Sequence, residues 1–107
     1  MSSSGQPTYR LPDHLIQRYR GRLRAHVESL RTARRALAAG ELEAQAGIRE
    51  RAHALRGSGG IYGFATVSEA AGRVEDCSDA ALLAELDRLL ECLSAAAAGY
   101  PAPEGQE

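Results

Sequence analysis

Apolar residues recur along the chain at spacings of three, four or seven positions, the period of an α-helix that buries one face. The first series stops before Gly40, a residue type that readily adopts the left-handed conformation in which helices end. Pro12 suits a first helical turn, and Asp13 suits the positive end of a helix dipole. The pattern predicts a long helix over about residues 12–39. Its inward positions are Ile16, Tyr19, Leu23, Val27, Leu30 and Leu37.

Two further series follow. One predicts a helix over about residues 41–58, and the glycines between residues 57 and 63 are expected to fray and end it. Thr66-Val67-Ser68-Glu69 then matches a capping box, whose hydroxyl and carboxylate bind free amides of a first turn. It predicts a third helix over about residues 66–77. The inward positions of these two helices are Ala44, Ile48, Ala52, Leu55, Val67, Ala70, Ala71 and Val74.

Ser78 and Asp79 can cap a fourth helix over about residues 79–98, which Gly99 closes. Its inward positions are Leu82, Leu86, Leu89, Leu93 and Ala96. Strand-like alternation of useful length and internal repeats do not appear. Short joints between amphipathic helices favour antiparallel neighbours. We therefore expect an all-α, antiparallel up-down-up-down four-helix bundle.

A chain of 107 residues has the size of one domain. We expect this domain over residues 11–99, with flexible tails at 1–10 and 100–107. The chain contains no lysine, so its 13 basic residues are all arginine, and most of them lie before residue 58. The excess of arginine in this half of the chain has two possible origins, the base composition of the genome or selection for binding to an acidic surface. Nucleic-acid binding is disfavoured, because the arginines of the first helix spread around it and aromatic stacking residues are scarce.

Other function classes are excluded by composition. Cys77 and Cys92 lack the spacing and the paired histidines of a zinc site, and we expect both to be free thiols in a reducing compartment. Apolar runs fall short of the ~18 residues of a membrane span, and the start lacks the apolar segment of a signal peptide. We expect a cytoplasmic, soluble monomer without a metal or cofactor of its own. Nucleotide-binding loops and Ser-His-acid patterns are also missing, which argues against a kinase or hydrolase.

The run from His53 to Gly63 carries the chemistry. Residues three or four positions apart share a helix face, so Arg49, His53, Arg56 and Gly57 are expected to form one patch. His53 lies one position off the inward residues, so its ring should reach water. A neutral imidazole can attack phosphorus, arginines offset phosphoryl charge, and Gly57 leaves room for an approaching carboxylate. Spacing alone leaves a second interpretation open, in which the glycines only end a helix and the charged side chains are solvated.

The same run resembles the signature of the histidine-containing phosphotransfer (HPt) domain. That signature is a histidine, any residue, an apolar residue, Lys or Arg, a glycine, five variable residues and a second glycine. The corresponding residues here are His53, Leu55, Arg56, Gly57 and Gly63. The segment 70–75 also resembles the third helix of the family, and the span of about 11–99 matches its helix order and lengths.

This resemblance implies a phosphocarrier of a multistep two-component phosphorelay, without kinase activity of its own. His53 would accept a phosphoryl group from an aspartate on the receiver domain of a hybrid sensor histidine kinase. It would pass the group to an aspartate of a response regulator, and the required Mg²⁺ would sit on the receiver. Arg56 would be the phosphate-facing cation. Gly57 would leave access to His53 for the partner carboxylate, and Gly63 would permit the turn into the third helix.

Glu75 and Arg49 are candidates for supporting roles beside His53. Glu75 aligns with a glutamate that, in chemotaxis-kinase relatives, hydrogen-bonds the other ring nitrogen of the histidine, although it could equally be a solvated helix residue. Arg49 is expected to support the phosphate site as a second cation. The chain departs from the family in two ways, because lysine is commoner at position 56 and Gly59-Gly60 is expected to shorten the second helix. The alternative function is an HPt-like module that docks receivers or a histidine kinase without transferring phosphate.

Overall fold

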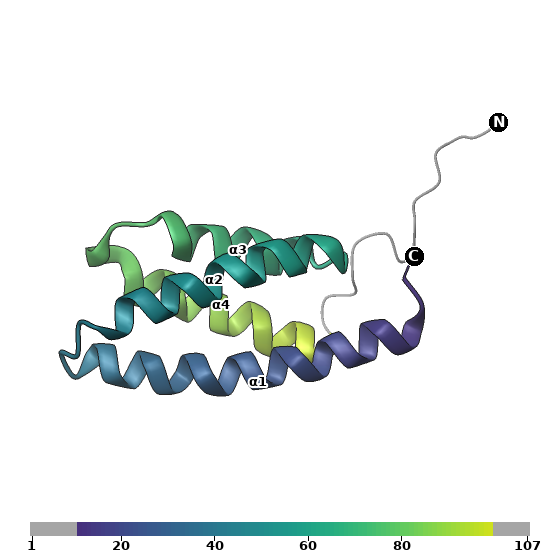
Figure 1. Cartoon of the computed structure of the whole chain (residues 1–107), viewed down its shortest axis with the longest axis horizontal. Helices are drawn as coiled ribbons and strands as arrows, with labels where there is room; N and C mark the ends of the chain where they lie inside the picture. Colours follow the sequence, from purple (N-terminus) through teal and green to yellow (C-terminus); the bar gives the residue numbers. More distant parts are fainter. Residues whose placement is uncertain (1–10, 100–107) are drawn as a thin grey trace.

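The computed structural model describes residues 11–99, which form four α-helices and one short 3-10 helix. Consecutive helices run in opposite directions, and each packs beside two others (Figure 1). The most extensive contacts join the second helix to the third and the first to the fourth. The predicted all-α four-helix bundle is confirmed. The helices are α1 (Asp13–Ala38), α2 (Ala44–Ile61), α3 (Ala65–Asp76) and α4 (Leu82–Ala97), with the 3-10 helix η1 (Asp79–Ala81) before α4. The tails predicted at 1–10 and 100–107 lie outside the described residues.

The core consists of the inward faces that the helical period predicts. All of the predicted inward residues are buried except Ala44, which is partly buried at the start of α2. The leucines of α1, α2 and α4 and the smaller apolar residues of α3 belong to one buried cluster. The hydroxyl of buried Tyr19 forms a 2.7 Å hydrogen bond with that of Ser58, which satisfies a polar group inside the bundle.

The end of α2 differs from its prediction. The glycines at positions 57, 59 and 60 remain helical, and α2 continues to Ile61. Gly59 is buried, and a Cβ atom there would lie 3.1 Å from the backbone nitrogen of Ser68 and 3.3 Å from the carbonyl oxygen of Phe64. The glycine therefore allows α2 and α3 to approach closely, and this packing compensates for its poor helix propensity. The turn itself uses Gly63, whose φ of 83° is in the left-handed region.

The starts of the last two helices also differ. The predicted capping box does not form, because α3 begins at Ala65 without a capping side chain and Thr66, the expected cap, lies inside its first turn. The hydroxyl of Ser68 donates to the carbonyl oxygen of Arg56 at 2.7 Å and so joins α3 to α2. Burial of Phe64 and its 2.7 Å backbone bond to Gly59 fix this start. Ser78 does cap, but the hydroxyl oxygen accepts from the Ala81 amide and so begins the 3-10 helix η1 rather than α4.

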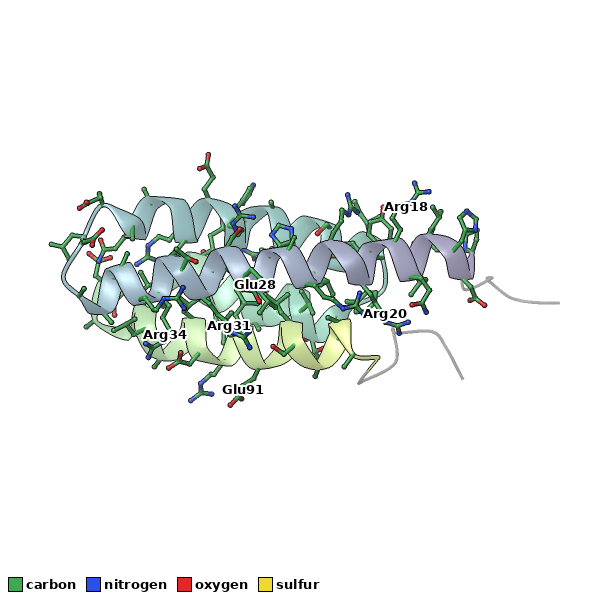
Figure 2. All side chains as sticks on the ribbon, turned by 90° about the horizontal axis from the view of Figure 1, so that it is seen from below. Arg18, Arg20, Glu28, Arg31, Arg34 and Glu91 are labelled. Atoms are coloured by element: carbon green, nitrogen blue, oxygen red, sulfur yellow. The ribbon has the colours of Figure 1, made fainter. Side chains whose placement is uncertain are left out.

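Arginines of α1 connect it to α4. Arg20 donates to the carbonyl oxygen of Ala96 at 3.1 Å, and Arg24 to that of Ala97 at 3.0 Å. Both carbonyls belong to the C-terminal turn of α4, where such groups lack helical partners and the helix dipole favours cations. Arg34 forms an ion pair with Asp87 further along the same two helices. Figure 2 shows Arg20 and Arg34 on the side of α1 that faces α4. Part of the arginine content of α1 is therefore explained by contacts within the bundle.

His26 is half-buried between α1 and α2, with its Nδ1 atom 3.0 Å from Nη1 of Arg51. A guanidinium can only donate, so Nδ1 must accept and the ring must be neutral for this bond to form. Burial lowers the pKa of His26, and the charges of Arg51 and Arg22 lower it further. The folded state therefore disfavours protonation of this histidine.

We expect this histidine to make the protein less stable in mild acid. Because the pKa of His26 is lower in the folded state, the unfolded chain binds a proton first as the pH falls below about 6.5. The free energy of unfolding should then decrease, by less than about 1.4 kcal/mol per pH unit, which is the limit for one proton. Above that range both states are neutral and the effect vanishes.

Urea denaturation of the wild type and His26→Gln at pH 7.5 and pH 5.5 measures this effect. The glutamine oxygen can still accept from Arg51 but does not titrate, so the variant should lose less stability between the two pH values. The other histidines contribute equally to both proteins. Equal losses in the two proteins would contradict the assignment.

Candidate functional site

His53 lies on the outer face of α2, directly after the buried Ala52 and two positions before the buried Leu55. Its side chain is 75% exposed. The helical period predicted that the ring is exposed to solvent, and the structure confirms this. An exposed imidazole on a rigid helix can be approached by a group from another molecule without any rearrangement of the core.

The carboxylate of Glu75 holds the ring from α3. Nδ1 of His53 lies 2.5 Å from Oε2 of Glu75. A carboxylate is only an acceptor, so Nδ1 carries the proton and a neutral ring keeps its lone pair on Nε2. Of the two sequence-based interpretations of Glu75, the structure therefore shows the one in which it hydrogen-bonds the histidine. The contact depends on how α2 lies against α3, which brings together residues 22 positions apart in the chain.

Glu75 is held as an anion. Partial burial raises the pKa of its carboxyl group, but hydrogen bonds from His53 and Arg56 and the charges of both residues lower it more, so the pKa lies below its ordinary value. The carboxylate is consequently ionised at neutral pH and can accept from both neighbours at once. This makes it a stable partner for the Nδ1 proton.

Arg56 binds the same carboxylate from the other side. Its Nη1 atom lies 3.1 Å from Oε1 of Glu75 and 3.5 Å from Oδ2 of Asp76. The side chain crosses α3 at Gly72, where a Cβ atom would lie 3.3 Å from Nε of Arg56. Sequence reasoning gave Gly72 no role. The sequence did indicate that Gly72 and Glu75 lie on one face of α3, because they are three residues apart.

Two glycines take the positions expected of them. Gly57 lies one turn beyond His53 on α2, and a Cβ atom there would have no neighbour within 4 Å. The surface beside the imidazole is therefore open. Gly63 provides the left-handed turn between α2 and α3, and this turn brings α3 back along the histidine-bearing helix.

Arg49 does not lie where the spacing predicts. It was expected to flank His53 as a second phosphate-facing cation, but its guanidinium points to the C-terminal end of α3. Nη1 lies 3.0, 3.1 and 2.8 Å from the carbonyl oxygens of Val74, Glu75 and Cys77, respectively. Nη2 forms a 2.8 Å ion pair with Asp79. Carbonyls at a helix end lack partners and carry negative partial charge, so they compete successfully for this cation.

The arrangement is an exposed histidine with one ring nitrogen anchored, one free for chemistry, a cation nearby and open space beside it. Within residues 11–99, no cluster of metal-binding side chains is present. Both cysteines are free thiols. No helix of the described part is long and apolar enough to cross a membrane.

A family model described as "Hpt domain" matches residues 14–99, which include nearly all of the four-helix bundle. This chain belongs to the Hpt domain family. Hpt domains are histidine phosphotransfer modules of phosphorelays and act as phosphocarriers rather than enzymes. They interact with receiver domains of kinases and response regulators. Comparison with curated proteins gives no match, and neither does comparison with solved structures.

Proposed function

We propose that this Hpt domain carries phosphate between two receiver domains in a multistep relay. His53 accepts a phosphoryl group from an aspartyl phosphate on a hybrid sensor histidine kinase and passes it to an aspartate of a response regulator. The observation that carries this proposal is the hydrogen bond from His53 to Glu75 on an exposed face of α2. It leaves the second ring nitrogen free as a nucleophile in a position that another protein can reach.

The transfer step follows from this geometry. The Nε2 lone pair attacks the phosphorus of the aspartyl phosphate, the N–P bond forms, and the bond between phosphorus and the carboxylate oxygen breaks. The leaving carboxylate returns to the partner as an anion. The proton on Nδ1 stays in place, and Glu75 balances the positive charge that the phosphorylated ring acquires. Transfer to the second receiver is the same step in reverse, with a different carboxylate.

Arg56 and Gly57 serve the incoming phosphoryl group. Arg56 contacts the carboxylate that anchors His53, so its positive charge lies beside the ring. Guanidinium groups pair well with phosphoryl oxygens, and phosphoryl transfer depends largely on such charge neutralisation. Gly57 keeps the adjoining surface free of side-chain atoms, so a partner carboxylate can approach in line. The Mg²⁺ that stabilises the aspartyl phosphate is expected on the receiver.

The proposal is tested by mixing the protein with a receiver domain that carries a radiolabelled aspartyl phosphate. The Hpt domain should acquire label that is stable in alkali and labile in acid, as expected of a phosphohistidine. Addition of a second, unphosphorylated receiver should remove the label. A stable complex that forms without any transfer of label would refute the proposal and establish a docking module instead.

A further inference from the structure

The C-terminal end of α3 concentrates negative charge. Glu75 and Asp76 occupy its last two positions, and Asp79 follows in η1. The helix dipole adds negative partial charge at the same end, which makes carboxylates unfavourable there. The residue that anchors His53 therefore lies in a segment that nearby positive charge stabilises.

Arg56 binds the two helical carboxylates, and the backbone at this end of α3 is stabilised from α2 by Arg49. One nitrogen of its guanidinium binds three carbonyl oxygens, and one of these belongs to Glu75 itself. The contact with Cys77 lies beyond the helix, where the backbone becomes extended. Arg49 thus spans the point at which α3 ends. Its side chain is only 23% exposed, so the contact is sheltered from water.

Helix α2 provides both the histidine and the arginine that holds the end of α3. Arg49 and His53 are four residues apart on α2 and both reach toward α3, one to the backbone of Glu75 and the other to its carboxylate. Glu75 is consequently held at both its main chain and its side chain by a single rigid element. A shift of the α3 end would move the carboxylate relative to the ring.

We propose that Arg49 is a positioning residue for phosphotransfer. It fixes the end of α3 so that Glu75 keeps the proton of His53 on Nδ1 and leaves Nε2 as the nucleophile. This inference rests on the proposed phosphotransfer at His53. Arg49 itself touches neither the ring nor the phosphoryl group.

The direct readout is the location of the ring proton, measured by ¹⁵N NMR of the histidine side chains in the full chain. In the wild type the His53 proton should reside on Nδ1. In Arg49→Met, which keeps the side-chain stem but removes the donors, a substantial fraction should move to Nε2. Arg49→Lys should restore part of the Nδ1 form, because an ammonium can still donate to the helix end. Arg51→Met removes a different arginine from α2, one that contacts His26, and should leave the His53 tautomer unchanged.

A second readout separates positioning from general destabilisation. Arg49→Met should slow phosphoryl acceptance on the order of tenfold, the lower end of the loss found when a metal-binding histidine loses the partner that orients it. Glu75→Ala should have a similar effect, and the double variant should be no slower than Glu75→Ala alone, because both changes remove the same anchor. A wild-type tautomer in Arg49→Met, or losses of rate that add in the double variant, would overturn the proposal.

The tautomer measurement needs no phosphoryl donor. If the wild type accepted no label, phosphotransfer at His53 would be refuted, while the effect of Arg49 on the ring would still be tested. If the wild type accepted label but the His53 tautomer was the same in Arg49→Met as in the wild type, only the positioning role would be refuted. The two failures are therefore distinguishable.

Discussion

His53→Gln is expected to abolish phosphoryl labelling completely while leaving the bundle folded. The imidazole is exposed, and its hydrogen bond to Glu75 joins surface groups, so its loss should change the free energy of unfolding by about 0.5 kcal/mol or less. Glutamine is similar in size but its amide nitrogen has no lone pair available for attack on phosphorus. Label transfer from a phosphorylated receiver measures the first effect, and circular dichroism with urea denaturation measures the second.

The other histidines provide matched controls. His14→Gln changes an exposed position in the first turn of α1, and His26→Gln changes the half-buried ring beside Arg51. Both variants should be labelled to the wild-type extent at neutral pH. Labelling of His53→Gln equal to that of the wild type would show that another residue accepts the phosphoryl group.

Gly57→Gln is expected to slow transfer by about a hundredfold without destabilising the protein. A Cβ atom at this position meets no neighbour within 4 Å, and replacing a helix-interior glycine removes a cost of up to about 1 kcal/mol. The long side chain instead projects into the space beside His53 that a partner carboxylate must cross. A displacement of about 1 Å in a reacting group can lower a rate by about a hundredfold.

Single-turnover transfer rates for three variants test this interpretation. Gly57→Ala adds only a methyl group and should slow transfer much less than Gly57→Gln. Gly47→Gln changes another glycine of α2 whose Cβ position is equally open, but one that lies away from the histidine, and should transfer at the wild-type rate. Unchanged transfer in Gly57→Gln would show that partners do not approach over this surface.

The sequence predicted the bundle because its large apolar side chains follow the helical period closely. The core positions of α1, α3 and α4 could be read from spacing alone. The end of α2 could not, because glycines that are poor helix formers in isolation remain helical where Gly59 packs against the backbone of α3. The capping box failed for a related reason, since a buried Phe64 fixed the start of α3 at Ala65 and so placed Thr66, the expected cap, inside the helix. In both cases tertiary packing overrode a local preference.

The sequence predicted the part of the site that lies on α2 alone. Spacing placed His53 in water, and Gly57 beside it has an open surface. Contacts between helices required the structure, because they depend on the register of α2 against α3. Arg49 illustrates the difference. Its position on α2 suggested a neighbour of the histidine, but a long side chain selects partners from whatever lies within its reach, and here those are the carbonyls at the end of α3.

The most direct measurement identifies the phosphorylated atom. After transfer from a phosphorylated receiver, NMR of the ¹⁵N-labelled domain should show the phosphoryl group on Nε2 of His53, with the proton retained on Nδ1 toward Glu75. A phosphoryl group on Nδ1 of His53, or on His14, His26 or any other residue, would contradict this account.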